Sequence, residues 1–351
     1  MKMRGIAGEA AVLAGGKMAA QGISLAAYFV LTRLFSPSDF GLYNIFYSYI
    51  DVLIILSTCK YELSTVVAGD EREAAAVSRF ALRLNTIVSL TLLTAALVLW
   101  TTGTLPGNFA PLGWMVLLIP PLAFFSGTSR IYCTLYNRFH RYGQIALSDN
   151  VGSATAAVLK IVFGLFGITP SGLPIGTVLG QAAANVNYRL HLGSLGLPST
   201  TAAEGRAAAR KHRNFPLFVA TKDFMNPFPA TLPFLWAAAY FDRAEVGLFG
   251  LALTFTLQPV NLLSSAFERV LYARTAEAVR ERRTIARTIV RFVLLLASAA
   301  VVVGVLAWFF AEPVFTFCFG ERWNGCGTYV RALLPWACLA LCSTSLMFVS
   351  N

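Results

Sequence analysis

Long apolar blocks alternate with short polar gaps along the whole chain. A helix needs about 20 apolar residues to cross the hydrocarbon core of a bilayer, whereas the strands of a membrane barrel are shorter and alternate in polarity. The pattern therefore predicts an all-α integral membrane protein with about ten transmembrane helices. The apolar blocks cover residues 9–33, 41–67, 78–100, 112–136, 143–167, 171–193, 214–240, 247–271, 288–311 and 327–350.

Basic residues gather in every second gap between these blocks. The gaps after the second, fourth, sixth and eighth blocks are rich in Arg, whereas residues 101–107 and 169–172 carry no charge. Cytoplasmic loops of membrane proteins carry the excess of Lys and Arg. The alternation therefore predicts a multi-pass membrane protein with its N-terminus in the cytoplasm.

Composition agrees with a membrane protein, because 56% of the residues are hydrophobic and only 13% are charged. The net charge of +11 lies in short loops, so it indicates contacts with anionic membrane lipids. We expect no nucleic-acid partner, because no segment resembles a nucleic-acid-binding module.

The longest polar interruption separates six blocks from four. We predict an N-terminal six-helix lobe over residues 1–193, a cytoplasmic linker over 194–213, and an incomplete C-terminal lobe of four helices over 214–351. A short amphipathic helix is expected within the linker, at Ala202–Lys211.

The two lobes begin with a similar pattern. Lys17 precedes Gly41 by 24 residues and Glu62 follows that glycine by 21; Lys222 precedes Gly247 by 25, and Glu268 follows by 21. Each glycine opens a Gly-Leu-aromatic sequence. Either this sequence is a common helix start, or the lobes are parallel, pseudo-symmetric repeats, as in carriers that bind substrate between two halves.

Ionisable and amide side chains inside the blocks are costly in lipid, so they mark a polar cleft or pair with partners. Cations suit an anionic ligand such as pyrophosphate, and acids suit H⁺ or Na⁺ coupling; no metal or other cofactor is expected. The cationic candidates are Lys17, Arg130, Lys160 and Lys222; the polar ones are Gln21, Asn44, Gln181, Asn226 and Asn261; the ion-coupling ones are Asp51, Asp149 and Glu268.

Alternatives stay open for some of these residues. Arg130 and Glu268 could instead extend to the membrane surface, and Lys222 could pair with a neighbouring acid. On a regular helix, Asn44, Asp51, Thr58 and Glu62 fall on one stripe. Asp149 and Lys160 share a face of one helix, about 16 Å apart, which is too far for a direct ion pair.

Three prolines in the seventh block, Pro227, Pro229 and Pro233, interrupt helical hydrogen bonding. We predict a hinge there; a static kink is the alternative. Cys318 and Cys326 lie near one outside loop, and the sequence leaves a disulfide between them open.

Several motifs resemble those of a known family. Leu31-Thr32-Arg33-Leu34-Phe35-Ser36-Pro37-Ser38-Asp39-Phe40-Gly41 is similar to the first-loop motif of polysaccharide repeat-unit flippases, in the multidrug/oligosaccharidyl-lipid/polysaccharide exporter superfamily. The order and spacing of the matching motifs along nearly the whole chain carry the resemblance. The other matching stretches are Asn137–Tyr142, Lys160–Leu165 with Gly172-Leu173 and Gly180-Gln181, Asn214-Phe215-Pro216, and Phe319–Trp323.

The resemblance implies a carrier, and no enzyme activity. It also implies two helical lobes in a V, in the bacterial cytoplasmic (inner) membrane. Such flippases move undecaprenyl-pyrophosphate-linked oligosaccharides to the periplasmic leaflet by alternating access, for O-antigen, capsule or exopolysaccharide synthesis, and a polysaccharide polymerase is an expected partner. Lys17, Lys160 and Lys222 would then contact pyrophosphate or sugar. Members have twelve or fourteen spans, so the ten expected here suggest a C-terminally truncated chain. The alternatives are a cation-coupled multidrug or metabolite antiporter of the same superfamily and an inactive truncated product.

Overall fold

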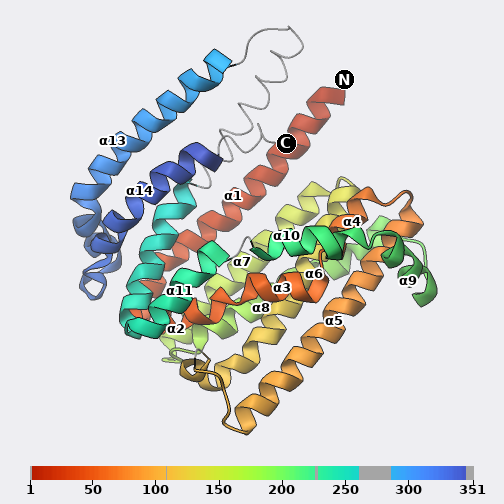
Figure 1. Cartoon of the computed structure of the whole chain (residues 1–351), viewed down its shortest axis with the longest axis horizontal. Helices are drawn as coiled ribbons and strands as arrows, with labels where there is room; N and C mark the ends of the chain where they lie inside the picture. The colour runs from red at the N-terminus through yellow and green to blue at the C-terminus, as the bar shows by residue number, and fades with distance from the viewer. Residues whose placement is uncertain (1, 108, 226–227, 261–285, 345–351) are drawn as a thin grey trace. The chain divides into compact units, whose positions relative to one another are not determined.

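The computed structural model describes residues 2–107, 109–225, 228–260 and 286–344, and all regular structure in these ranges is helical. Figure 1 shows the arrangement of the helices. The chain divides into two compact units. The first unit contains Met1–Phe35 and Leu42–Arg243, and the second contains Ser36–Gly41 and Ala244–Asn351.

Within the described residues, helices occupy the predicted apolar blocks. Five described spans are long and apolar enough to cross a membrane: Pro37–Thr58, Glu71–Thr101, Ala110–Arg138, Tyr142–Leu165 and Ala300–Phe319. In chain order the elements are α1 (Lys2–Leu34), α2 (Pro37–Ser48), α3 (Ile50–Thr58), α4 (Tyr61–Val67), α5 (Glu71–Thr101), η1 (Ala110–Leu118), α6 (Ile119–Arg138), α7 (Tyr142–Leu165), α8 (Gly172–His191), η2 (Leu192–Leu195), α9 (Ala202–Lys211), η3 (Phe215–Val219), α10 (Ala220–Met225), α11 (Phe228–Tyr240), a helix over residues 243–260, α13 (Ala286–Phe319), η4 (Glu321–Trp323) and α14 (Cys326–Thr344).

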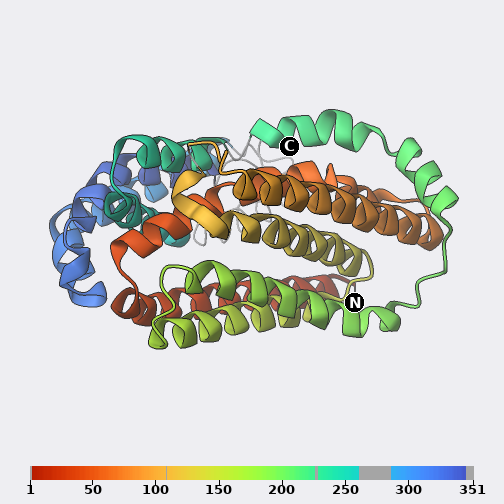
Figure 2. The ribbon, with the colours of Figure 1, turned by 90° about the horizontal axis from the view of Figure 1, so that it is seen from below.

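Helix α7 packs between α1 and α8 in the first unit, and Figure 2 shows the three helices side by side. Small residues allow this close approach. A Cβ atom on Gly16 would collide with Ala146, and one on Gly180 would lie 2.7 Å from the carbonyl oxygen of Gly152. Close packing of small residues is the usual basis of helix association in membranes, because lipid tails weaken the hydrophobic drive.

A buried amide joins α5 to α6. The side chain of Asn85 is fully buried, and its Nδ2 donates to the carbonyl of Phe124 at 2.9 Å and to the Thr128 hydroxyl at 3.0 Å. A polar group at this depth needs such partners because water is absent from a packed apolar interior.

The second block is not one continuous helix, so the predicted stripe from Asn44 to Glu62 is wrong. Cys59 and Lys60 adopt left-handed backbone angles, with φ of 47° and 59°, and they separate α3 from α4. The break rotates Glu62 away from the line that Asn44 and Asp51 would share on a regular helix. Glu62 is consequently 3% exposed in α4, whereas Asp51 is exposed.

The seventh block also begins irregularly. It opens with a π-helical turn, Phe215–Val219, and continues through α10 to α11. Pro229 and Pro233 lie in α11, with Pro233 inside the helix, and Pro227 lies outside the described residues. The hinge stays a prediction.

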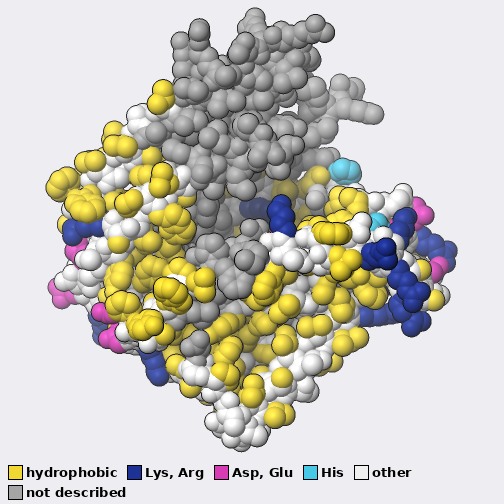
Figure 3. Space-filling model, in the orientation of Figure 1, with side chains coloured by type: hydrophobic (Ala, Val, Ile, Leu, Met, Phe, Trp, Pro, Cys, Tyr) yellow, Lys and Arg dark blue, Asp and Glu magenta, His cyan; other side chains and the backbone are white. Residues whose placement is uncertain are grey.

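The amphipathic helix in the linker is confirmed at Ala202–Lys211. Thr201 and Glu204 form a capping box at its start, which satisfies two backbone N–H groups. Ion pairs from Arg72 to Glu204 (2.8 Å) and from Lys211 to Glu73 (2.7 Å) hold α9 against the beginning of α5. Figure 3 shows Lys and Arg side chains gathered over α9 and the start of α5.

In the second unit, the glycines of the two Gly-Leu-aromatic motifs lie close together. A Cβ atom on Gly247 would collide with the carbonyl oxygen of Pro37 and would lie 3.1 Å from the backbone nitrogen of Gly41. Phe40 packs edge-on against the fully buried Trp323, with ring centroids 5.1 Å apart. The equivalent glycines of the predicted repeats therefore belong to one packed core. Cys318 and Cys326 are both free thiols.

Candidate functional site

Lys160, near the end of α7, is held by a hydroxyl group of α2, which in turn bonds to a hydroxyl group of α8. Its Nζ donates to the Tyr43 hydroxyl of α2 at 3.1 Å and lies 4.8 Å from the centre of the Tyr43 ring. The Tyr43 hydroxyl also bonds to the Thr177 hydroxyl of α8 at 3.1 Å. Gly176 makes room for the lysine stem, because a Cβ there would lie 2.6 Å from Lys160 Cγ. The cation is thus fixed on a polar support without a carboxylate in ion-pair contact among the described residues.

Asp51 and Arg130 form an ion pair between α3 and α6. Arg130 Nη2 donates to Asp51 Oδ1 at 2.5 Å. The Arg130 side chain is 40% exposed, and the Asp51 side chain is 57% exposed. Both residues lie within apolar spans. A half-exposed ion pair at such a position is unfavourable against lipid, so this face is expected to border water or a polar ligand.

Tyr47 connects these two groups. Its ring lies 6.0 Å from the Tyr43 ring between centroids, and it precedes Asp51, the partner of Arg130, by four residues. Tyr47 is 46% exposed. The first unit therefore presents a row of polar and aromatic groups from Lys160 through Tyr43 and Tyr47 to Arg130, called the polar row below.

Gln181 lies beside the arginine end of the polar row. Ser129, the neighbour of Arg130, donates to Gln181 Oε1 at 3.3 Å, and Asn185 Nδ2 donates to Ser129 Oγ at 3.1 Å. Asn185 is buried and also donates to the carbonyl of Phe125 at 2.8 Å. These bonds orient α6 against α8 next to the ion pair.

A second acid–base group lies on α1, α7 and α8. The Tyr188 hydroxyl donates to Asp149 Oδ1 at 3.3 Å, and the exposed Lys17 interacts electrostatically with the same carboxylate. Asp149 and Lys160 therefore face different partners, Tyr188 and Tyr43, in keeping with their predicted separation along α7.

The remaining predicted site residues lie on α1, α2 and α10 or outside the described residues. Gln21 and Asn44 are half-buried, and Lys222 is exposed on α10. The acid beside Lys222, Asp223, pairs with Lys60 at 2.9 Å. Asn226, Asn261 and Glu268 lie outside the described residues.

The arrangement can bind an anion at its cations, and it can hydrogen-bond hydroxyl groups at its tyrosines and amides. Sequence reasoning missed Tyr43, Tyr47 and Tyr188, which connect or hold the charged residues. Tyrosine inside an apolar span is common, so only the i,i+4 spacing of Tyr43 and Tyr47, which places them on one helix face, could have pointed to them.

The chain matches a family model over residues 30–328, and the description of that family is polysaccharide biosynthesis protein. The protein belongs to this family. The match covers both the polar row and the packed glycine motifs. No curated protein sequence matches the chain.

Solved structures of MATE transporters share the fold. One shows an inward-facing multidrug resistance MATE family transporter of the MOP superfamily; its TM-score is 0.62 at 14% identity, over 94% of this chain and 81% of the other. A MATE mutant gives a TM-score of 0.53 at 15% identity, over 96% and 80% of the two chains. A eukaryotic MATE transporter gives 0.51 at 16% identity, over 97% and 80%. The expected two-lobed, all-helical membrane fold is thereby confirmed.

Proposed function

We propose that the protein moves a lipid-linked oligosaccharide, carried on undecaprenyl pyrophosphate, across the bacterial inner membrane for surface polysaccharide synthesis. The family match over residues 30–328 is the observation that carries this proposal. The resemblance of its motifs to polysaccharide repeat-unit flippases supports it, and so does a fold shared with carriers.

The polar row supports the proposed substrate class. Lys160 and Arg130 offer positive charge for a pyrophosphate, and Tyr43, Tyr47 and Gln181 offer donors and acceptors for sugar hydroxyls. Aromatic rings with a polar edge suit a ligand that has both apolar and hydroxyl-bearing faces. In this proposal Lys17 and Lys222 are further pyrophosphate contacts, and Asp51 and Asp149 take up H⁺ or Na⁺ as access alternates.

Deletion of the gene tests the proposal in cells. We expect surface polysaccharide to disappear and lipid-linked repeat units to accumulate on the cytoplasmic side, and a plasmid copy to restore both. Normal surface polysaccharide in a clean deletion would contradict the proposal. Purified protein in vesicles should also expose a labelled lipid-linked saccharide to a membrane-impermeant glycosidase.

The alternative is an antiporter of drugs or metabolites, which the shared MATE fold brings into consideration. Cationic dyes are the usual cargo to test for such a carrier. Efflux of a dye that depends on the protein, together with unchanged surface polysaccharide on deletion, would favour the antiporter. Cationic residues on the polar row favour an anionic ligand instead, because like charges repel.

A further inference from the structure

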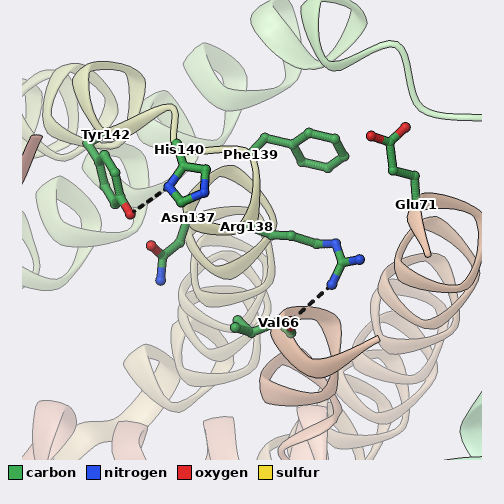
Figure 4. Close-up of a pocket in the computed structure, with 7 residues that line it drawn as sticks. All are labelled: Val66, Glu71, Asn137, Arg138, Phe139, His140 and Tyr142. Carbon is green, nitrogen blue, oxygen red and sulfur yellow. Dashed lines mark hydrogen bonds between the residues drawn. The ribbon is translucent and has the colours of Figure 1, made fainter. Parts of the chain in front are cut away.

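A cavity of about 520 Å³ opens where four helix ends of the first unit meet. It lies between the end of α4, the start of α5, the end of α6 and the start of α7 (Figure 4). This is the side that the distribution of basic residues predicts to be cytoplasmic. The cavity is lined by Val66, Glu71, Asn137, Arg138, Phe139, His140 and Tyr142.

Arg138 is fixed in the cavity wall with only part of its hydrogen-bonding capacity used. Its Nη1 donates to the carbonyl oxygens of Thr65 and Val66, each at 3.0 Å, and so caps the end of α4. Within the described part of the chain, Nε and Nη2 donate to no protein acceptor. An anchored guanidinium with a remaining N–H fork is well suited to phosphate oxygens.

The opposite side of the cavity adds two more polar groups. His140 adopts a left-handed backbone with φ of 54°, which brings its Nδ1 to 3.2 Å from the Tyr142 hydroxyl. Figure 4 shows Arg138 reaching toward α4 and α5, with His140 and Tyr142 at the far end of the loop. A left-handed conformation is unfavourable for a residue with a Cβ, so the fold maintains the ring in this place.

The remaining wall is apolar, formed by Val66, Phe139 and the Tyr142 ring. A free phosphate would gain nothing from these groups, whereas the first methylenes of a lipid would bury surface against them. Glu71 lines the same cavity but forms no ion pair with Arg138 in the part of the chain that the structure describes. Arg141 follows His140 directly and adds positive potential without lining the cavity.

We propose that this cavity binds the phosphate group of a membrane lipid at the cytoplasmic surface, with Arg138 as its main contact. Two lipids carry the required chemistry: an isoprenyl diphosphate and an anionic glycerophospholipid. The inference does not rest on the proposed function, because a phospholipid headgroup would occupy the cavity whatever the carrier moves.

Binding to the full chain, purified in neutral detergent, tests the proposal by calorimetry. The probes are farnesyl diphosphate, dihexanoyl phosphatidylglycerol and, as a probe without phosphate, farnesol. We expect Arg138→Gln to weaken binding of the preferred phosphate probe at least about tenfold. The matched control, Arg141→Gln, removes the same charge from the same loop and should change it less than about twofold.

Two variants leave the α4 cap intact, so they keep the test decisive if Arg138→Gln fails to fold. Glu71→Gln should strengthen phosphate binding about threefold, because a like charge leaves the wall. Tyr142→Phe should weaken it about threefold by removing the hydroxyl that holds His140. A merely structural role of these residues would not predict opposite signs.

The probes also distinguish the source of the phosphate. Preference for farnesyl diphosphate supports a site for the isoprenyl carrier, and preference for phosphatidylglycerol supports a structural lipid site. Equal effects of Arg138→Gln and Arg141→Gln, or farnesol binding as tightly as farnesyl diphosphate, would overturn the proposal.

Discussion

Lys160 is the predicted cationic residue whose surroundings the structure defines most completely. It lies in an apolar helix and is stabilised by a hydroxyl and an aromatic ring of Tyr43. A lysine that serves only to hold the fold would be expected to pair with a carboxylate, because this compensates its desolvation most directly. The absence of such an ion pair among the described residues leaves its charge for a ligand.

We therefore expect Lys160→Met to reduce transport at least about tenfold, because one charge-assisted contact with pyrophosphate is lost. Tyr43→Phe should have an intermediate effect, since it removes the hydroxyl that positions the ammonium but keeps the ring. Restoration of surface polysaccharide in a deletion strain, normalised to the amount of protein in the membrane, measures both. Lys211→Met, which removes an exposed lysine at the end of α9, is the matched control and should transport normally.

The Asp51–Arg130 pair allows function to be separated from stability. Both side chains are about half exposed, so the coupling free energy between Asp51→Asn and Arg130→Gln should be below about 1 kcal/mol in a double-mutant thermal unfolding cycle. Transport should nevertheless fall at least about tenfold in each single variant, since Arg130 is proposed to contact the substrate. Transport that recovers in the double variant would show that the pair serves only the fold.

At the level of elements, sequence patterning anticipated most helices well. The predicted blocks 143–167 and 171–193 correspond to α7, Tyr142–Leu165, and α8, Gly172–His191, and α9 begins and ends at the predicted residues. Apolar length and capping residues are local properties, so they can be recognised without the fold. Lys160 and Arg130 could be recognised as candidates for the same reason.

The break within the second block and the partners of the charged residues could not be recognised from the sequence. Cys59 and Lys60 are neither Gly nor Pro, so nothing local announces the left-handed turn between α3 and α4. The partners of the charged residues are also set by packing. Tyr43 is 117 residues from Lys160, and Asp51 is 79 residues from Arg130, and only the folding of the first unit brings them together.

Helix α9 carries a prediction for pH. The backbone N–H of Thr201 donates to Glu204 at 2.7 Å, and this bond, with the adjacent Arg72, lowers the pKa of the Glu204 carboxyl. Because the pKa is lowered in the folded state, the ionised carboxylate stabilises the capped helix at pH values above the ordinary glutamate pKa of about 4.3. That contribution is lost as the pH falls through the lower, folded-state pKa.

Hydrogen exchange of the first turn of α9 measures this effect. Protection of the Glu204 and Gly205 amides, corrected for the intrinsic rate, should fall at acid pH in the native chain. In Glu204→Gln the protection should be weaker at neutral pH and should change little on acidification, because the amide does not titrate. A native chain and a Glu204→Gln variant with the same pH dependence would contradict the assignment. Arg72→Gln should have only a small effect, since its ion pair is exposed.

For the whole molecule, the contact between the two glycine motifs links the beginning of the chain to its later part. Ser36–Gly41 belongs to the unit that contains residues 244–351. Ser36 and Asp39 cap α2 here, because Asp39 Oδ2 accepts from the Ser36 backbone at 2.8 Å and Pro37 occupies the first turn. In the repeat, Asp242 and Glu245 have the same spacing before Gly247. The two helix starts therefore share a capping pattern and pack on each other through their glycines.

Gly247→Ala should therefore lower the thermal stability of the protein in detergent. The new methyl group would collide with the Pro37 carbonyl, and backbone cannot yield as a flexible side chain can. The cost of such overpacking is typically about 1–3 kcal/mol. Gly22→Ala in α1 is the matched control: a Cβ there meets no atom within 4 Å, and alanine favours a helix by up to about 1 kcal/mol, so stability should stay the same or rise. If both variants unfold at the same temperature, the two motifs do not pack as described, and the equivalence of the two repeats loses its structural support.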